Sequence, residues 1–308
     1  MLDIFLKTLP FFGLIGLGYF ACRTRFFTEE AAAYLTKFVF YFALSAMLFR
    51  FAATLPVSEI FDAQFVYAYL SASLAVYVLA IALSLLRGKS VEEAAVEAQC
   101  AVSGNTGFMG IPMFFLLLGE ASTGPMLMVL TIDMLVFSSL IVILITGSRD
   151  GRMSLGILGT VIKGLFKNPM IVSILLGLIW SQTEIGLIGP ADEFLTILGG
   201  AATPGALFAI GASLAAKSAE RVSVASWLSF LKLIVHPAAV ALAAFWVFSV
   251  EPFAALVMVA GASLPVAGNV YILAQQYGVA PQRVSSTILI STAVSIFTIT
   301  GIIALLQG

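Results

Sequence analysis

Two stretches of the chain combine glycine, proline and asparagine within otherwise apolar sequence. One is residues 103–112, which reads Ser-Gly-Asn-Thr-Gly-Phe-Met-Gly-Ile-Pro, and the other is residues 261–269, with two glycines, a proline and an asparagine. Glycine loosens a helix and proline removes an amide donor, so both stretches are expected to interrupt helices. The second half of an interrupted helix begins with free N–H groups at the positive end of its dipole. The two stretches therefore predict a neutral pocket that favours anions.

Candidate binding residues follow from these interruptions. Four residues are expected to form the breaks: Gly104, Pro112, Pro265 and Gly268. Asn105, Thr106 and Asn269 are expected to hold a ligand beside the half-helix ends. Gln275 and Gln276 could donate hydrogen bonds to the same ligand, or they could pack between helices. The alternative for both stretches is that glycine and proline merely kink two packed helices.

Ionisable side chains are rare inside the apolar segments. Four of them are candidates for proton or cation coupling: Asp133, Glu97, Lys232 and His236. A carboxylate in the middle of a membrane helix costs about 2.5 kcal/mol or more on insertion scales, so Asp133 is expected to face a cavity or a partner. It could take up a proton or help to hold a sodium ion there. A structural hydrogen bond from a protonated carboxyl group is the alternative.

The other three candidates also have two interpretations each. Lys232 and His236 are four residues apart and share a helix face. His236, the single histidine, could titrate near neutral pH, or it could satisfy backbone groups freed by Pro237. Lys232 could snorkel to the membrane surface, or it could point inward to Asp133 or to a ligand carboxylate. Glu97 could take part in coupling, although its surroundings are typical of a solvated interfacial segment.

The composition indicates that these residues lie in a membrane protein. Of 308 residues, 61% are hydrophobic and 10% are charged, whereas soluble domains have roughly 25% charged residues. Fifteen basic residues against sixteen acidic ones leave no surplus for nucleic-acid binding. Cys22 and Cys100 are too isolated for a disulfide framework or a metal site.

Uncharged runs predict ten membrane spans, which leave only short loops and no room for a soluble catalytic domain. The spans cover about residues 8–22, 33–53, 65–86, 98–119, 124–147, from 169, 194–216, 222–250, from 252, and 284–306. The first span has no small-residue cleavage site, so we expect a membrane helix there rather than a removed signal.

The distribution of basic residues predicts the orientation of the chain, because cytoplasmic loops are enriched in Lys and Arg. The loops after odd-numbered spans hold the following basic residues: Arg23, Arg25, Arg87, Lys89, Arg149, Arg152, Lys163, Lys167, Lys217, Arg221 and Arg283. Loops after even-numbered spans hold none, although Arg50 lies near one. We therefore expect an inner (cytoplasmic) membrane protein whose odd-side loops face the cytoplasm and whose two termini face the other side.

A weak internal repeat relates the two halves of the chain. Pro10 and Gly18 recur with the same spacing as Pro169 and Gly177. The same offset aligns the Leu-Phe pair at residues 48–49 with the Leu-Phe pair at 207–208. With a five-residue insertion, it also aligns the Gly-Asn pair at 104–105 with the Gly-Asn pair at 268–269. Five spans per half is an odd number, so the halves are expected to be inverted, as in many transporters. Residues 1–147 and 169–308 are the expected repeats, and 148–168 the expected cytoplasmic linker.

Residues 105–112 and 264–278 resemble the two crossover segments of the auxin efflux carrier family, which includes plant PIN auxin exporters and bacterial malonate and malate permeases. Residues 204–214 resemble the family's seventh span, and 232–237 its eighth. Ser45 stands where members commonly have proline, and the link between the halves is short, which argues against plant-type kinase control.

The resemblance implies a bile-acid symporter-like, all-α membrane fold of ten transmembrane helices in two inverted five-helix repeats, with broken crossover helices in spans four and nine. It also implies a homodimer formed through scaffold spans one, two, six and seven. The remaining spans would then form a mobile core that carries a small organic anion by an elevator movement.

The sequence can be interpreted as a carrier, as a channel or ligand-sensing protein, or as a membrane enzyme. A carrier of mono- or dicarboxylates, driven by H⁺, by Na⁺ or by the substrate gradient alone, is the interpretation we favour, and auxin-like aromatic acids are a weaker option. A channel or ligand-sensing protein on the same fold is the alternative. An enzyme is not expected, because the sequence lacks His-Glu-x-x-His and Gly-x-Gly-Asp motifs. The expected partners are the organic anion and membrane lipid, with no cofactor or metal beyond a coupling ion.

Overall fold

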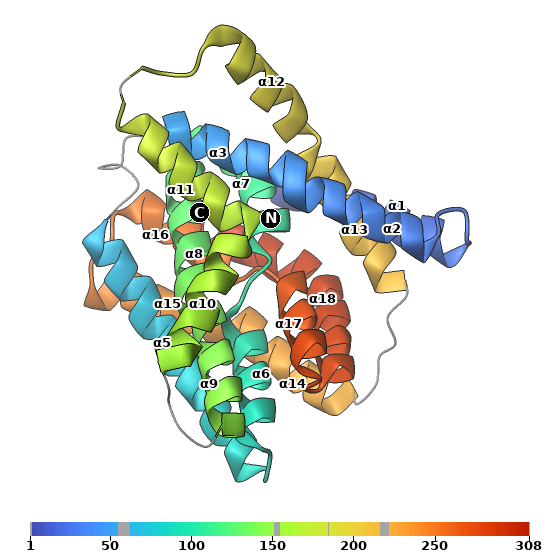
Figure 1. The fold of residues 1–308 in the computed structure, drawn as a ribbon, viewed down its shortest axis with the longest axis vertical. Coiled ribbons are helices and arrows are strands. Elements are labelled where there is room, and N and C mark those ends of the chain that lie inside the picture. Colours follow the sequence, from blue (N-terminus) through green and yellow to red (C-terminus); the bar gives the residue numbers. More distant parts are fainter. Residues whose placement is uncertain (1, 55–61, 151–154, 184, 216–221, 308) are drawn as a thin grey trace.

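The structure is a computed structural model, shown in Figure 1. It describes residues 2–54, 62–150, 155–183, 185–215 and 222–307. Regular structure within these residues is helical, apart from one isolated β-bridge between Gly104 and Val266. The prediction of an all-α chain is confirmed.

Seventeen α-helices make up most of the described chain. Their bounds are α1 (Leu2–Arg23), α2 (Glu29–Phe38), α3 (Leu44–Thr54), α5 (Ala63–Leu86), α6 (Val91–Val102), α7 (Ile111–Leu118), α8 (Thr123–Ile132), α9 (Ser138–Asp150), α10 (Leu155–Lys167), α11 (Pro169–Ser181), α12 (Gly189–Gly200), α13 (Ala202–Ala215), α14 (Val222–Phe230), α15 (His236–Leu242), α16 (Pro252–Ala262), α17 (Gly268–Tyr277) and α18 (Pro281–Gln307). A 3₁₀ turn, Glu120–Ser122, precedes α8. Five π-helical turns connect or extend helices: Val39–Ala43, Thr106–Gly110, Asp133–Phe137, Leu231–Val235 and Ala243–Val247.

Six helical segments of the described chain are long and apolar enough to cross a membrane, and a seventh is added if α10 and α11 count as one bent span. Three shorter apolar segments, Leu9–Arg23, Thr106–Leu118 and Pro252–Ala262, fall below that length. Two of the three lie next to the glycine- and proline-rich stretches, which shorten the helices there. The chain is a multi-pass membrane protein.

One group of helices packs closely through glycine. Helix α1 lies against α13, and α3 lies against α11 and α12, in the upper part of Figure 1. At Gly18 a Cβ atom would collide with the backbone carbonyl of Phe208, and at Gly177 it would lie 2.6 Å from the carbonyl oxygen of Phe49. Arg50, the basic residue near an even-side loop, forms an ion pair with Asp192 of α12 at 2.6 Å. Only glycine permits helix axes to approach this closely.

A second group of helices surrounds the two interrupted stretches. Helix α5 packs on α6 and α15, α16 packs on α8 and α15, and α18 packs on α14 and α17. In Figure 1, helices α6, α14, α17 and α18 lie in the lower part of the molecule. Local sequence sets two helix ends here. Ser90 Oγ accepts the amide of Glu93 at the start of α6, and Gly278 ends α17 with a left-handed φ of +67°.

Most of the expected cytoplasmic linker is a helix rather than a loop. Helix α10 occupies the described end of this segment and meets α11 at a bend of 76°. Asn168 lies at the bend and caps α11 by accepting the amide of Met170 at 3.0 Å. Apolar residues at helical spacing on α10 explain why this segment folds. Three predicted loop residues lie outside the described residues: Arg152, Lys217 and Arg221.

Candidate anion site at two interrupted helices

The two glycine- and proline-rich stretches pair with each other. Helix α6 ends at Val102 and passes directly into extended backbone at Ser103. Helix α16 ends at Ala262, and a turn that starts at Ser263 precedes the pairing residues there. The amide of Asn105 donates to the carbonyl oxygen of Pro265 at 2.8 Å, and the amide of Ala267 donates to the carbonyl oxygen of Ser103 at 3.1 Å. This short pairing satisfies backbone groups that would be costly to leave unpaired inside a membrane.

The first break lies at residues 103–105, and the structure corrects the role that we gave to Pro112. The chain becomes helical again at Thr106, and Pro112 lies at the start of α7, after the break. Pro112 therefore lies inside the helical segment Thr106–Leu118, directly after a π-helical turn whose altered hydrogen-bond spacing accommodates a residue without an amide donor. The other three predicted break residues, Gly104, Pro265 and Gly268, do lie at the pairing or directly after it.

Each pairing strand leads into a second half-helix. One begins at Thr106 and continues into α7, and the other, α17, begins at Gly268. The first amides of a helix have no acceptor within it, and the helix dipole adds partial positive charge at the same end. Both starts line a single cavity of about 730 Å³.

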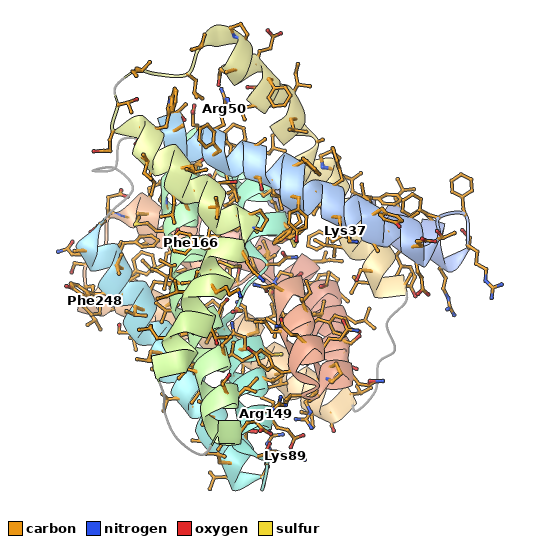
Figure 2. All side chains as sticks on the ribbon, viewed as in Figure 1. Lys37, Arg50, Lys89, Arg149, Phe166 and Phe248 are labelled. Atoms are coloured by element: carbon orange, nitrogen blue, oxygen red, sulfur yellow. The ribbon has the colours of Figure 1, made fainter. Side chains whose placement is uncertain are left out.

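The charge of this cavity is one-sided. Its walls come from both breaks, from α2 and α13 on one side, and from α9, α10 and α17 on the other. Two lysines, Lys37 of α2 and Lys167 of α10, are the charged residues among its described lining, which includes no Asp or Glu. Figure 2 shows Lys37 on α2. Two helix starts and two exposed lysines in the lining therefore favour anions over cations in this cavity.

Four of the five predicted ligand-binding residues line the cavity, and one does not. Asn105 and Thr106 are 7% and 1% exposed, and Asn269 is partly buried. The amide nitrogen of Asn269 lies 3.9 Å from Met134 Sδ, while its buried Oδ1 atom has no hydrogen-bond partner. Gln276 lines the cavity, whereas Gln275, which precedes it on α17, is exposed and lies outside the lining.

Behind the breaks lies a separate, fully buried polar cluster. Asp133 begins a π-helical turn and accepts a hydrogen bond from the hydroxyl of Tyr69 at 2.9 Å, while its second oxygen has no partner. His236 Nε2 lies 2.8 Å from Ser73 Oγ, and His236 Nδ1 lies 3.3 Å from Lys232 Nζ. Three of the four predicted coupling residues are thus neighbours, and none of the three is part of the cavity lining.

The structure decides between two interpretations of Lys232 and of His236. Lys232 is 0% exposed and donates to the carbonyl oxygen of Ala262, so the prediction that it snorkels is wrong. Its four-carbon stem is held within the core, because the carbonyl at the end of α16 and the ring of His236 supply polar partners. The imidazole of His236 binds side chains, not backbone freed by Pro237.

Glu97, the fourth coupling candidate, belongs to an ion-pair network at one end of the second helix group. Its carboxylate pairs with Arg87 and, at 2.6 Å, with Arg283, and Arg283 also reaches Glu93 at 2.8 Å. The Glu97 side chain is 1% exposed, so Glu97 itself is not part of a solvated segment. Arg149 and Lys89 lie close to the network (Figure 2).

Several contributors to these sites escaped the sequence analysis. Lys167 is expected in a cytoplasmic loop, no motif marks Lys37, and Tyr69 and Ser73 lie in an uncharged run with no motif. The apolar spacing of α10 could have predicted a helix beside the cavity. No group of three or more His, Cys, Asp or Glu side chains in the described chain is arranged to hold a metal ion.

Comparison with known proteins identifies the family of the chain. A family described as "Membrane transport protein" matches residues 3–303. A protein of Rhizobium meliloti (strain 1021), named "Putative malonate transporter", is 31% identical over 311 residues, which cover 100% of this chain and 97% of that protein. The chain belongs to the membrane transport protein family, which is the auxin efflux carrier family that its two crossover segments resemble.

Proposed function

We propose that the protein is a secondary carrier of small carboxylates and binds them in the cavity between the two half-helix starts. The observation that carries this proposal is the one-sided charge of that cavity, with two helix starts, Lys37, Lys167 and no acidic residue in its described lining. A first carboxylate would accept hydrogen bonds from the amides near Thr106 and Gly268. Asn105 and Asn269 would orient it.

The cavity supports a small dicarboxylate as the first substrate to test. Its volume of about 730 Å³ lies within the usual range for small-molecule sites of roughly 300–1,000 Å³. A second carboxylate could interact with Lys37 or Lys167. Malonate, which the relative's name mentions, is the simplest probe with two carboxylates. An auxin-like aromatic acid would use only one of the two anion-binding regions.

Movement would follow the division into two helix groups. Gly18 contacts Phe208, and Gly177 contacts Phe49. The internal repeat aligns Gly18 with Gly177 and Phe49 with Phe208, so the second contact is the equivalent of the first, which supports ten spans in two inverted repeats. We propose that α1–α3 and α11–α13 form a scaffold that dimerises. The second group would carry the anion past the scaffold in an elevator movement, in the inner membrane, with both termini outside the cytoplasm.

Coupling would involve the buried cluster behind the breaks. Within this cluster we propose Asp133 as the residue that binds the proton or sodium ion, because one of its carboxylate oxygens is buried without a partner. The cluster does not line the cavity, so it would act on the breaks and not on the substrate directly. Proton coupling, sodium coupling and uniport remain distinct forms of this proposal, and they differ in their response to pH and to sodium.

The deciding experiment is uptake of radiolabelled malonate by the full chain in proteoliposomes. We expect uptake that saturates and that accelerates when unlabelled malonate is present inside, because a carrier exchanges its substrate. Flux that neither saturates nor exchanges would identify a channel and contradict the proposal. A thermal-shift series with mono- and dicarboxylates provides an independent measure of binding, because a ligand of the folded state raises the melting temperature.

A further inference from the structure

The ammonium group of Lys232 lies where the first halves of both interrupted helices end. It donates to the carbonyl oxygen of Ala262, which is the last residue of α16. On the other side is Gly104, two residues beyond the end of α6, where a Cβ atom would lie 3.4 Å from Lys232 Nζ. The ammonium group thus faces the pairing of the two breaks from behind.

The surroundings of this ammonium group suit a cation. The C-terminal end of a helix carries partial negative charge, and two such ends converge here. Asp133 belongs to the same buried cluster as Lys232. An ammonium group can only donate, so His236 Nδ1 must accept from it, and Nε2 then carries the hydrogen that Ser73 Oγ accepts. The two polar groups in contact with Lys232 Nζ, the carbonyl oxygen of Ala262 and Nδ1 of His236, are therefore both acceptors.

Converging half-helix ends and unwound carbonyls are the groups that hold a coupling sodium ion in many secondary transporters. A primary ammonium and a sodium ion carry the same charge and use the same carbonyl and carboxylate oxygens. Lys232 lies in the π-helical turn Leu231–Val235, which connects α14 to α15, and its side chain is 0% exposed. A side chain thus occupies the place that a mobile ion would take.

We propose that Lys232 is a built-in monovalent cation that replaces sodium at the pairing of the two breaks. Lys232 is a positioning residue: it holds the ends of α6 and α16 together, so that the starts of the opposite half-helices keep facing the cavity. Consequently the protein needs no sodium ion to fold around the breaks or to bind its anion. The consequence for transport rests on the proposed carrier function, whereas the cation position does not.

The first test is thermal unfolding of the full chain in detergent without substrate, in sodium chloride and in choline chloride. The wild-type melting temperature is expected to be the same in both salts. Lys232→Met empties the position and leaves the acceptors in place, so sodium is expected to raise its melting temperature by about 2–4 °C for each kcal/mol of binding energy. Lys89→Met, at a partly buried lysine outside the breaks and the cavity lining, is the control and should show no difference between the salts.

The second test is malonate uptake in the same two salts. We expect equal uptake by the wild type, a loss of about tenfold or more for Lys232→Met in choline, and partial recovery in sodium. Lys232→Arg keeps the charge and should remain independent of sodium. Lys89→Met should behave like the wild type.

Four results would overturn the inference. The first is wild-type uptake or stability that depends on sodium, and the second is full activity of Lys232→Met in choline. The third is a folded Lys232→Met whose stability and uptake are the same in sodium and in choline. The fourth is a Lys232→Arg variant that needs sodium. If Lys232→Met does not fold, Lys232→Gln takes its place, and the wild-type comparison still decides. A wild type that transports no carboxylate contradicts the carrier proposal alone, because the melting shift is measured without substrate.

Discussion

The amide of Asn105 donates to the carbonyl oxygen of Pro265 across a distance of 2.8 Å, and this hydrogen bond joins two interrupted helices from opposite halves of the chain. Together with the reciprocal bond from Ala267 to Ser103, it makes the two breaks one structural unit. The two half-helix starts consequently line the same cavity, and the Lys232 side chain lies against Ala262 and close to Gly104. The proposed anion site and the proposed cation position therefore share one short backbone pairing.

The asparagines at the half-helix starts should determine affinity for the anion. Asn105→Ala and Asn269→Ala are each expected to raise the KM for malonate by about ten- to a hundredfold, because a hydrogen bond to a charged group contributes roughly 1.5–3 kcal/mol. Proteoliposome uptake measures this, with the melting temperature as the test of folding. Gln275→Ala, at an amide outside the cavity, should have no effect. Near-normal uptake by either asparagine variant would remove that residue from the site.

The two cavity lysines should favour dicarboxylates over monocarboxylates. Lys37→Gln and Lys167→Gln are each expected to raise the KM for malonate by about two- to fivefold, as partly solvated charges contribute roughly 0.5–1 kcal/mol. The effect should shrink at high salt because the charges are screened. Lys163→Gln is the matched control, since this exposed lysine lies one turn from Lys167 on α10 but outside the cavity lining. Equal losses for all three variants would indicate a nonspecific surface effect.

Asp133 should control the pH dependence of transport. Asp133→Asn keeps the shape of the side chain and removes its proton exchange, so uptake by this variant is expected to vary less with pH than uptake by the wild type. Tyr69→Phe removes the hydrogen bond to Asp133 but keeps the carboxylate, and it should displace the pH profile without flattening it. A pH profile of Asp133→Asn identical to that of the wild type would exclude Asp133 from coupling.

The two break glycines should respond differently to alanine. A Cβ atom at Gly104 would lie 3.3 Å from the carbonyl oxygen of Gly261, so Gly104→Ala is expected to destabilise the protein by about 1–3 kcal/mol through overpacking. A Cβ atom at Gly268 would meet nothing within 4 Å, so Gly268→Ala should be neutral or stabilise by about 0.4–1 kcal/mol. Thermal unfolding in detergent measures both, and equal destabilisation would contradict the pairing geometry.

The ion pairs of Glu97 should contribute to stability and not to coupling. Glu97→Gln leaves Arg283 short of a partner at a buried position, so a loss of about 3 kcal/mol in unfolding free energy is expected. Lys89→Gln, which removes a loose, partly solvated pair with Glu93 at 4.0 Å, should change stability by less than about 1 kcal/mol. Below its melting temperature, Glu97→Gln should keep the wild-type pH dependence of uptake. A flattened pH profile would return Glu97 to the coupling candidates.

Sequence patterns alone determined that the chain is an all-helical membrane protein with two interrupted helices, because apolar runs, glycine and proline act on the backbone locally. They also selected Asn105, Thr106, Asn269 and Gln276, which all line the cavity. Only the tertiary structure decided which side of the breaks each polar residue occupies. Lys37 and Lys167 are part of the cavity lining, while Lys232 is buried and donates to the carbonyl oxygen of Ala262. The sequence could not predict this, because the surroundings of a side chain depend on helices packed from distant parts of the chain.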